Sequence, residues 1–211
     1  MSDLLAAARL AETMCARICH DLGGPMGTVD TCLELMAEGQ TDAETMAAAA
    51  AAMEVMQARL RLLRAAWGPH PGPLTLTALH DLTAGLPNAR KLTLETDRLP
   101  ANGAFAPGFG RALAAVLLLA GQSLPGGGQI VLFGTHEDVL VRIAGPHAAW
   151  PEGLALALRE DAALDPILDE PRQLALPMAV LVARAQGLRL SLLLPVGGGT
   201  EPAPLRLSAI A

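Results

Sequence analysis

Three residues near the N-terminus, His20, Asp21 and Pro25, have types and a spacing that could perform chemistry. A neutral imidazole is a good nucleophile near neutral pH, and an adjacent carboxylate can hold its second ring nitrogen in one tautomer. We therefore expect His20 to accept and pass on a phosphoryl group. Asp21 would stabilise the charge that develops on the ring, and Arg17 would stabilise the phosphoryl oxygens. The alternative is an ordinary solvated surface histidine, which is what a lone histidine in a helix usually is.

The residues around His20 on its expected helix are small. Gly23 and Gly24 follow it by one helical turn and so share its face. Each glycine costs a helix about 1 kcal/mol relative to alanine, so we expect the glycines to give a second protein close access to the imidazole. Pro25 removes a helical hydrogen bond and is expected to bend the helix. Docking specificity is expected from exposed side chains around His20 on two helices, namely Arg17, Asp21, Gln57, Arg61 and Arg64.

Two long helices are expected to position these residues. Apolar side chains recur every three or four positions from residue 3 to residue 38, which is a helical period. Gly39 is a typical C-terminal stop. Thr41, with Glu44 three residues later, resembles a capping box that starts a second helix with the same period, reaching Trp67. The short connection makes the two helices antiparallel neighbours.

One helical hairpin makes a poor core, because it cannot cover the apolar stripes of both helices. A second hairpin from another copy of the chain would complete a four-helix bundle. We therefore expect a homodimer formed through residues 1–68.

The second part of the chain predicts a different architecture. Pro69, Pro71 and Pro73 cannot continue a helix, so residues 69–73 read as a linker. Residues 74–211 are expected to form an α/β sandwich with helices on one face of a mixed sheet. The overall fold class is thus α+β. The expected strands are 91–95, 129–133, 139–144 and 188–194, with a last short strand after a turn at Gly197–Gly199; the expected helices are 78–86, 109–124 and 173–186.

Composition excludes several classes of function. The 211 residues carry a formal net charge of −6, which gives no general reason to bind nucleic acid. The start of the chain lacks a signal-peptide pattern, and the apolar run 112–120 is too short to cross a bilayer, so we expect a cytoplasmic protein without membrane attachment. Cys15 and Cys19 lie one turn apart beside His20, but a fourth ligand is not evident, so we expect small, buried, reduced thiols and no metal site.

The segment Ala16–Gly27 resembles the phosphoacceptor helix of two-component histidine kinases, whose pattern is His-Glu/Asp-x-x-x-Pro. More specifically, it resembles the ChpT-type histidine phosphotransferases of alphaproteobacteria. The resemblance covers the whole chain in layout but only this segment at the level of motif. It implies a homodimer that takes phosphate from the receiver domain of a hybrid histidine kinase and passes it to response regulators such as CtrA-like regulators. It also implies a second domain that resembles a kinase ATP-binding domain, does not bind ATP and helps to dock the regulators.

The residues support the loss of ATP binding independently. The helix expected to carry a Mg²⁺-binding asparagine, residues 111–122, contains no Asn, Asp or Glu. The strand that should end in an adenine-binding aspartate ends instead at Gly145 and Pro146, and residues 174–179 contain no glycine-rich lid. We therefore expect no cofactor, with Mg²⁺ supplied only by the partner receiver domain. The alternatives are a non-enzymatic dimeric scaffold that binds receiver domains, and an ATP-dependent sensor-type kinase.

Overall fold

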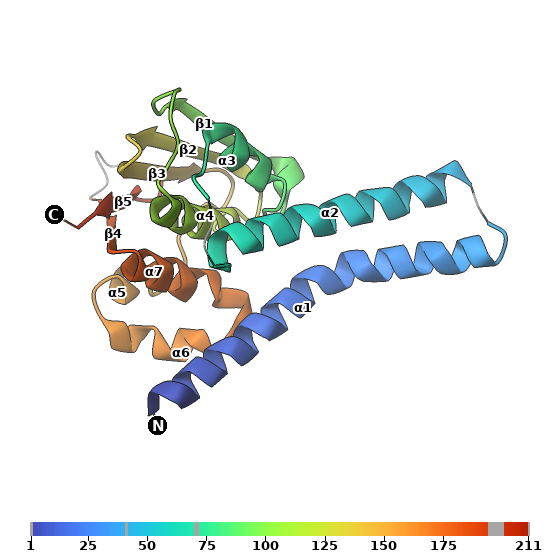
Figure 1. Cartoon of the computed structure of the whole chain (residues 1–211), viewed down its shortest axis with the longest axis horizontal. Coiled ribbons are helices and arrows are strands. Elements are labelled where there is room, and N and C mark those ends of the chain that lie inside the picture. Colours follow the sequence, from blue (N-terminus) through green and yellow to red (C-terminus); the bar gives the residue numbers. More distant parts are fainter. Residues whose placement is uncertain (1, 41, 70–71, 194–200, 211) are drawn as a thin grey trace.

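A computed structural model describes residues 2–40, 42–69, 72–193 and 201–210 of the chain. Two long antiparallel helices project from a five-stranded sheet that is covered by shorter helices (Figure 1). The expected fold class, α+β, is confirmed. The α-helices are α1 (Ser2–Ala37), α2 (Ala43–Trp67), α3 (Leu76–Thr83), α4 (Pro107–Gln122), α5 (Leu154–Ala157), α6 (Asp165–Leu168) and α7 (Ala175–Ala185). The strands are β1 (Leu92–Arg98), β2 (Gly128–Gly134), β3 (Asp138–Ala144), β4 (Leu188–Leu192) and β5 (Leu205–Ala209).

The ends of the two long helices follow simple local rules. Gly39, with φ +89°, takes the left-handed conformation expected after a helix C-terminus. The predicted cap at Thr41 is wrong in position: Thr41 lies outside the described residues, and the N-cap of α2 is Asp42, whose carboxylate accepts a hydrogen bond from Thr45 N at 2.7 Å. That bond lowers the pKa of Asp42. Asp is as good an N-cap as Thr, so composition alone did not separate the two positions.

Helix α1 continues through Pro25 and changes direction near its middle (Figure 1). Proline has no N–H, so the carbonyl of Asp21 lacks its usual helical partner. Thr28 also donates its hydroxyl to the carbonyl of Gly24 at 3.3 Å, a back-bond that is common where helices bend. The predicted bend after His20 is therefore present.

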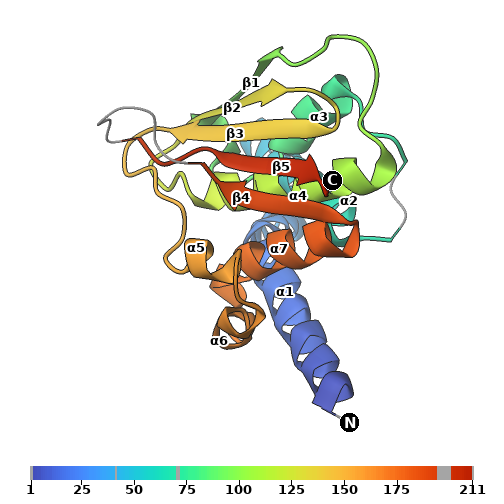
Figure 2. The same cartoon turned by 90° about the vertical axis from the view of Figure 1, so that its left-hand side faces the viewer.

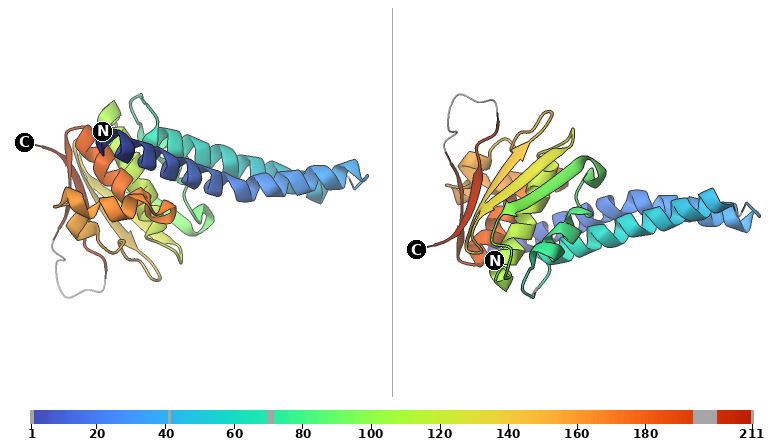
Figure 3. Two further views of the ribbon diagram at one scale, coloured as in Figure 1. Left: turned by 90° about the horizontal axis from the view of Figure 1, so that it is seen from below. Right: turned by 90° about the horizontal axis from the view of Figure 1, so that it is seen from above.

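The sheet has the strand order β1-β2-β3-β5-β4. Strands β1 and β2 pair in parallel, and the other neighbours pair antiparallel, as expected of a mixed sheet. Helices α3, α4 and α7 all lie on one face of it (Figures 2 and 3). In β3, buried residues alternate with half-buried ones, so one face meets the helices while the other is partly open. The last short strand exists as β5, whereas the predicted turn at residues 197–199 lies outside the described residues.

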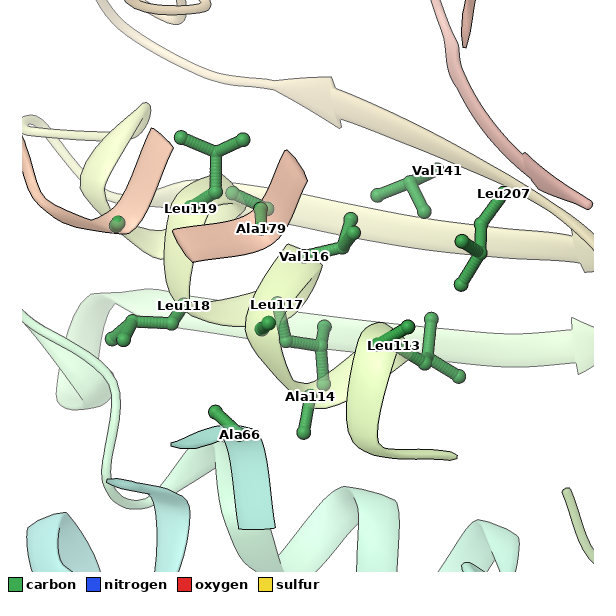
Figure 4. Close-up of a cluster of buried hydrophobic side chains, with 14 of the residues drawn as sticks. Ala66, Leu113, Ala114, Val116, Leu117, Leu118, Leu119, Val141, Ala179 and Leu207 are labelled. Atoms are coloured by element: carbon green, nitrogen blue, oxygen red, sulfur yellow. The ribbon is translucent and has the colours of Figure 1, made fainter. Parts of the chain in front are cut away.

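The C-terminal end of α2 belongs to the core of the second part of the chain. Ala66 packs beside Ala114 and Leu118 of α4, while the opposite side of α4 faces Val141 and Leu207 of the sheet (Figure 4). The carbonyl of Trp67 also accepts a hydrogen bond from Arg111 Nη2 at 3.2 Å. The two parts thus share one continuous cluster of buried side chains. The division into residues 1–68, 69–73 and 74–211 stays a prediction.

Residues 154–173 form a set of short elements for which the sequence predicted no structure. They are α5, the 3₁₀ turn η2 (Asp161–Ala163), α6 and the 3₁₀ turn η3 (Pro171–Gln173); a further 3₁₀ turn, η1 (Ala89–Lys91), precedes β1. Elements of three or four residues are too short to show a period, which explains why they were missed. The segment matters because η3 and α6 contact α1. In the described parts of the chain, no helix is both long enough and apolar enough to span a bilayer.

Candidate functional site

His20 and Asp21 are adjacent in sequence but differ sharply in exposure. The side chain of His20 is 65% exposed, whereas that of Asp21 is only 7% exposed. Consecutive residues of a helix point about 100° apart, so the imidazole faces solvent while the carboxylate turns inward toward α2. The prediction that His20 is reachable from solvent is confirmed.

The two side chains face each other through specific atoms. His20 Nδ1 lies 3.4 Å from Asp21 Oδ1, at the long end of hydrogen-bond range. This contact favours a proton on Nδ1 and leaves Nε2 as the ring nitrogen with a free lone pair. The other carboxylate oxygen, Oδ2, accepts a hydrogen bond from Arg17 Nε at 3.0 Å. Asp21 therefore connects an exposed imidazole to a buried guanidinium.

Arg17 is buried and joins α1 to the second part of the chain. Its Nη1 donates to the carbonyls of Pro171 at 3.2 Å and Arg172 at 3.1 Å, both in η3. The carboxamide oxygen of Gln122, at the end of α4, accepts from Arg17 Nη2 at 2.7 Å. The prediction that Arg17 and Asp21 are exposed docking side chains is wrong, because both are held in this network. With its donors occupied, Arg17 is a support for Asp21 rather than a free ligand for phosphoryl oxygens.

A second arginine, Arg59 of α2, approaches the same carboxylate. Its Nη1 lies 3.9 Å from Asp21 Oδ2. No role was predicted for Arg59 from the sequence. A signal was available, because Arg59 lies three residues after Met56 and four before Leu63, on the inward apolar face of α2. A charged residue at such a position indicates a buried ionic partner.

The glycines after His20 leave its surroundings open. A Cβ atom added to Gly23, Gly24 or Gly27 would meet nothing within 4 Å. Packing within this chain therefore does not require glycine at these positions, and the expected access to the imidazole is present. Gln57, Arg61 and Arg64 are exposed as expected. Gln57 and Arg64, however, lie one turn before and after Leu60, so they flank that residue rather than His20, and their role in docking stays a prediction.

Comparisons with known proteins show which proteins this chain resembles. No protein-family model matches the chain. Over 64 residues, 30% of this chain, the sequence is 39% identical to the protein phosphotransferase ChpT of Brucella abortus (strain 2308). A solved structure of a bacterial phosphotransferase has a TM-score of 0.72, with 21% identity, and the match covers 96% of this chain and 97% of that one. The chain resembles the ChpT-type phosphotransferases. The sequence match spans 31% of the length of the Brucella relative, and the structural match shows the shared fold.

The hairpin of this ChpT-like chain carries an apolar stripe without a partner in the single chain. We call "the hairpin stripe" five exposed side chains at seven-residue spacing: Met26 and Leu33 on α1, and Met46, Met53 and Leu60 on α2. Each follows an inward-facing position by one residue. Because the helices are antiparallel, this offset turns both sets to the same side of the hairpin. His20 instead precedes the inward-facing Asp21 by one residue, so it lies on the other side of the hairpin from the stripe.

A cavity of about 540 Å³ lies beside the C-terminal end of α4. It is bounded by the end of α4, the loop after β3 and η3, and its lining includes Gln122, His147, Trp150 and Arg172. No carboxylate is among its described lining residues. Mg²⁺ prefers hard oxygen ligands, and carboxylates are the usual protein ones. The described lining of this cavity thus offers no carboxylate to hold Mg²⁺.

His80 and the three cysteines are the remaining candidates for chemistry. His80, the second histidine followed by an aspartate, places Nε2 2.9 Å from Thr96 Oγ1. All three cysteines are free thiols, and Cys32 is buried. The prediction that Cys15 and Cys19 are buried is wrong, because both lie on exposed faces of α1. Within the described ranges, no group of three or more His, Cys, Asp or Glu side chains could hold a metal ion. The expectation of no metal and no cofactor stays a prediction.

Proposed function

We propose that the chain is a histidine phosphotransferase of a two-component phosphorelay, carrying the phosphoryl group on His20. One observation carries the proposal: an exposed imidazole contacts, through Nδ1, a buried carboxylate that is paired with arginine. This arrangement prepares Nε2 for nucleophilic attack. The open backbone at Gly23 and Gly24 supports it, because another protein must bring its phosphoryl group close to the ring.

The donor in this proposal is an aspartyl phosphate on the receiver domain of a hybrid histidine kinase. Nε2 of His20 attacks phosphorus, an N–P bond forms, and the P–O bond to the aspartyl carboxylate breaks with its electron pair going to that carboxylate. The ring keeps its proton on Nδ1 and becomes positively charged, and Asp21 stabilises this charge by accepting the Nδ1 hydrogen bond. The reverse reaction delivers phosphate to the aspartate of a response regulator, such as a CtrA-like regulator. Mg²⁺ bound by the receiver domain would neutralise the phosphoryl oxygens.

The proposed reaction needs no ATP. The cavity beside α4 lacks a described carboxylate for Mg²⁺, and α4 itself presents no Asn, Asp or Glu. The phosphate must then arrive from another phosphorylated protein rather than from a nucleotide. We infer a cytoplasmic protein that meets its partners without binding nucleic acid or membrane.

The proposed assembly is a homodimer in which two hairpin stripes face each other. Exposed apolar side chains at heptad spacing on two antiparallel helices are typical of a four-helix bundle. The stripe and His20 lie on different sides of the hairpin, so dimerisation would leave both imidazoles reachable. Two receiver domains could then dock on one dimer.

The test is transfer from a phosphorylated receiver domain in the absence of ATP. We expect acid-labile phosphate on the wild-type chain and none on H20Q. The variant H80Q is a matched control, because His80 is also followed by an aspartate but contacts Thr96 instead. Label retained by H20Q would refute the assignment of His20. Receiver binding without label on the wild-type chain would indicate a scaffold, and label from ATP would indicate a kinase.

A further inference from the structure

Arg59 is a buried cation whose presence the proposed reaction does not yet explain. Its side chain is 14% exposed, and its Nη1 atom is buried without a hydrogen-bond partner among the described residues. Burial lowers the pKa of this guanidinium, and the neighbouring Asp21 carboxylate acts in the opposite direction. A buried charge is costly to a fold unless a counter-charge compensates it. Asp21 is the counter-charge that faces Arg59.

The position of Arg59 differs from that of the other arginines on its helix. Arg61 and Arg64 are exposed, whereas Arg59 turns inward toward α1. The separation from Asp21 Oδ2 is 3.9 Å, which is longer than a hydrogen bond, so Arg59 acts on the carboxylate through its charge. Arg17, in contrast, holds the same oxygen by a direct hydrogen bond. Two cations from different helices therefore attract the same oxygen of Asp21, Oδ2.

This arrangement determines which atom of Asp21 reaches His20. Since Arg17 and Arg59 both attract Oδ2, the carboxylate is held with Oδ1 toward His20 Nδ1. We propose that Arg59 is a positioning residue for phosphotransfer, a role that rests on the proposed function. It orients the Asp21 carboxylate from the α2 side, and so keeps the His20 proton on Nδ1. Arg59 itself touches neither the ring nor the phosphoryl group.

The experiment compares R59M and R59K with the wild-type full chain. Methionine keeps the unbranched stem and the helix preference of arginine but removes the charge, and lysine keeps the charge. R159M is the matched control, because Arg159 is an exposed arginine in the turn that follows α5. The first readout is the tautomer of His20 in the unphosphorylated protein, from ¹⁵N chemical shifts of the ring nitrogens. The signal is assigned by its absence in H20Q among the five histidines of the chain.

We expect His20 to carry its proton on Nδ1 in the wild type, R59K and R159M, and to lose this preference in R59M. The second readout is the rate of phosphotransfer, which we expect to fall about tenfold or more in R59M and to recover largely in R59K, because oriented acid–base partners typically contribute about 10²–10⁴ in rate. A folded R59M with the wild-type tautomer and rate would overturn the proposal. If the wild type accepts no phosphate, the proposed function fails, while the tautomer comparison still decides whether Arg59 orients Asp21.

Discussion

Placing a charge on the hairpin stripe should separate the proposed dimer, and Met53 of α2 is the most direct site for this test. Its side chain is 41% exposed in the single chain. Full burial of a methionine side chain stabilises by about 1.5–3 kcal/mol, so covering the exposed part contributes about 1 kcal/mol. A two-fold dimer contains two copies, so M53A should lose about 2 kcal/mol and weaken association about 30-fold.

Glutamate at the same position should have a larger effect. M53E loses the same apolar contact and also removes two carboxylates from water at the interface, which adds at least about 1 kcal/mol for each. The total of about 4 kcal/mol corresponds to about 1,000-fold weaker association. Sedimentation velocity over a micromolar concentration series measures the change directly, and circular dichroism checks that the helices persist.

Val55 provides the matched control for Met53. It lies two residues away on α2 and is 46% exposed, but it lines the hollow between α2 and residues 84–91 instead of the hairpin stripe. V55E should therefore remain as dimeric as the wild type. The reasoning is refuted if M53E stays a dimer at the concentrations where the wild type does, if V55E dissociates equally, or if the wild type has the mass of one chain throughout.

Four further outcomes follow from the site. D21N should slow phosphotransfer about 10²–10⁴-fold. It should also lower the free energy of unfolding by about 3 kcal/mol, because two buried arginines lose their counter-charge. A wild-type rate in the folded variant would contradict the mechanism. R17M should speed hydrogen exchange in residues 165–173, while R9M, which removes only an exposed ion pair with Asp169, should not. G24A should stabilise α1 by about 1 kcal/mol, as measured by thermal unfolding. It should also slow phosphotransfer severalfold in the receiver assay. An unchanged rate would show that the glycine is not needed for access to the imidazole of His20. Calorimetry should detect no binding of ATP with Mg²⁺, and a micromolar affinity would reverse our interpretation of the cavity beside α4.

Hydrophobic periodicity predicted the large elements of this fold. The period of the apolar residues located α1 and α2, and the short apolar runs located the strands within a few residues. The residue pair that we propose for the chemistry could also be recognised, because His20 and Asp21 are adjacent in sequence. The exposure of His20 was predicted correctly, whereas the burial of Asp21 was not. What could not be predicted depends on contacts between distant segments. The carbonyls of η3 that hold Arg17 lie more than 150 residues from it in the chain.

Arg17 was predicted to be exposed but is buried. The difference shows why a motif identifies a candidate reactive residue more readily than the residues that hold it in place. An arginine one turn before a histidine has the same sequence pattern whether it faces solvent or the protein interior. The choice here depends on η3 and Gln122, which offer acceptors only after the chain has folded. Arg59 is the complementary case: a cation on an apolar helix face indicates a buried partner, and the level at which α2 crosses α1 identifies that partner as Asp21. In our proposal the imidazole of His20 needs Asp21 from its own helix and Arg59 from the next. A change in how the two helices pack would then also change the position of the proton on His20.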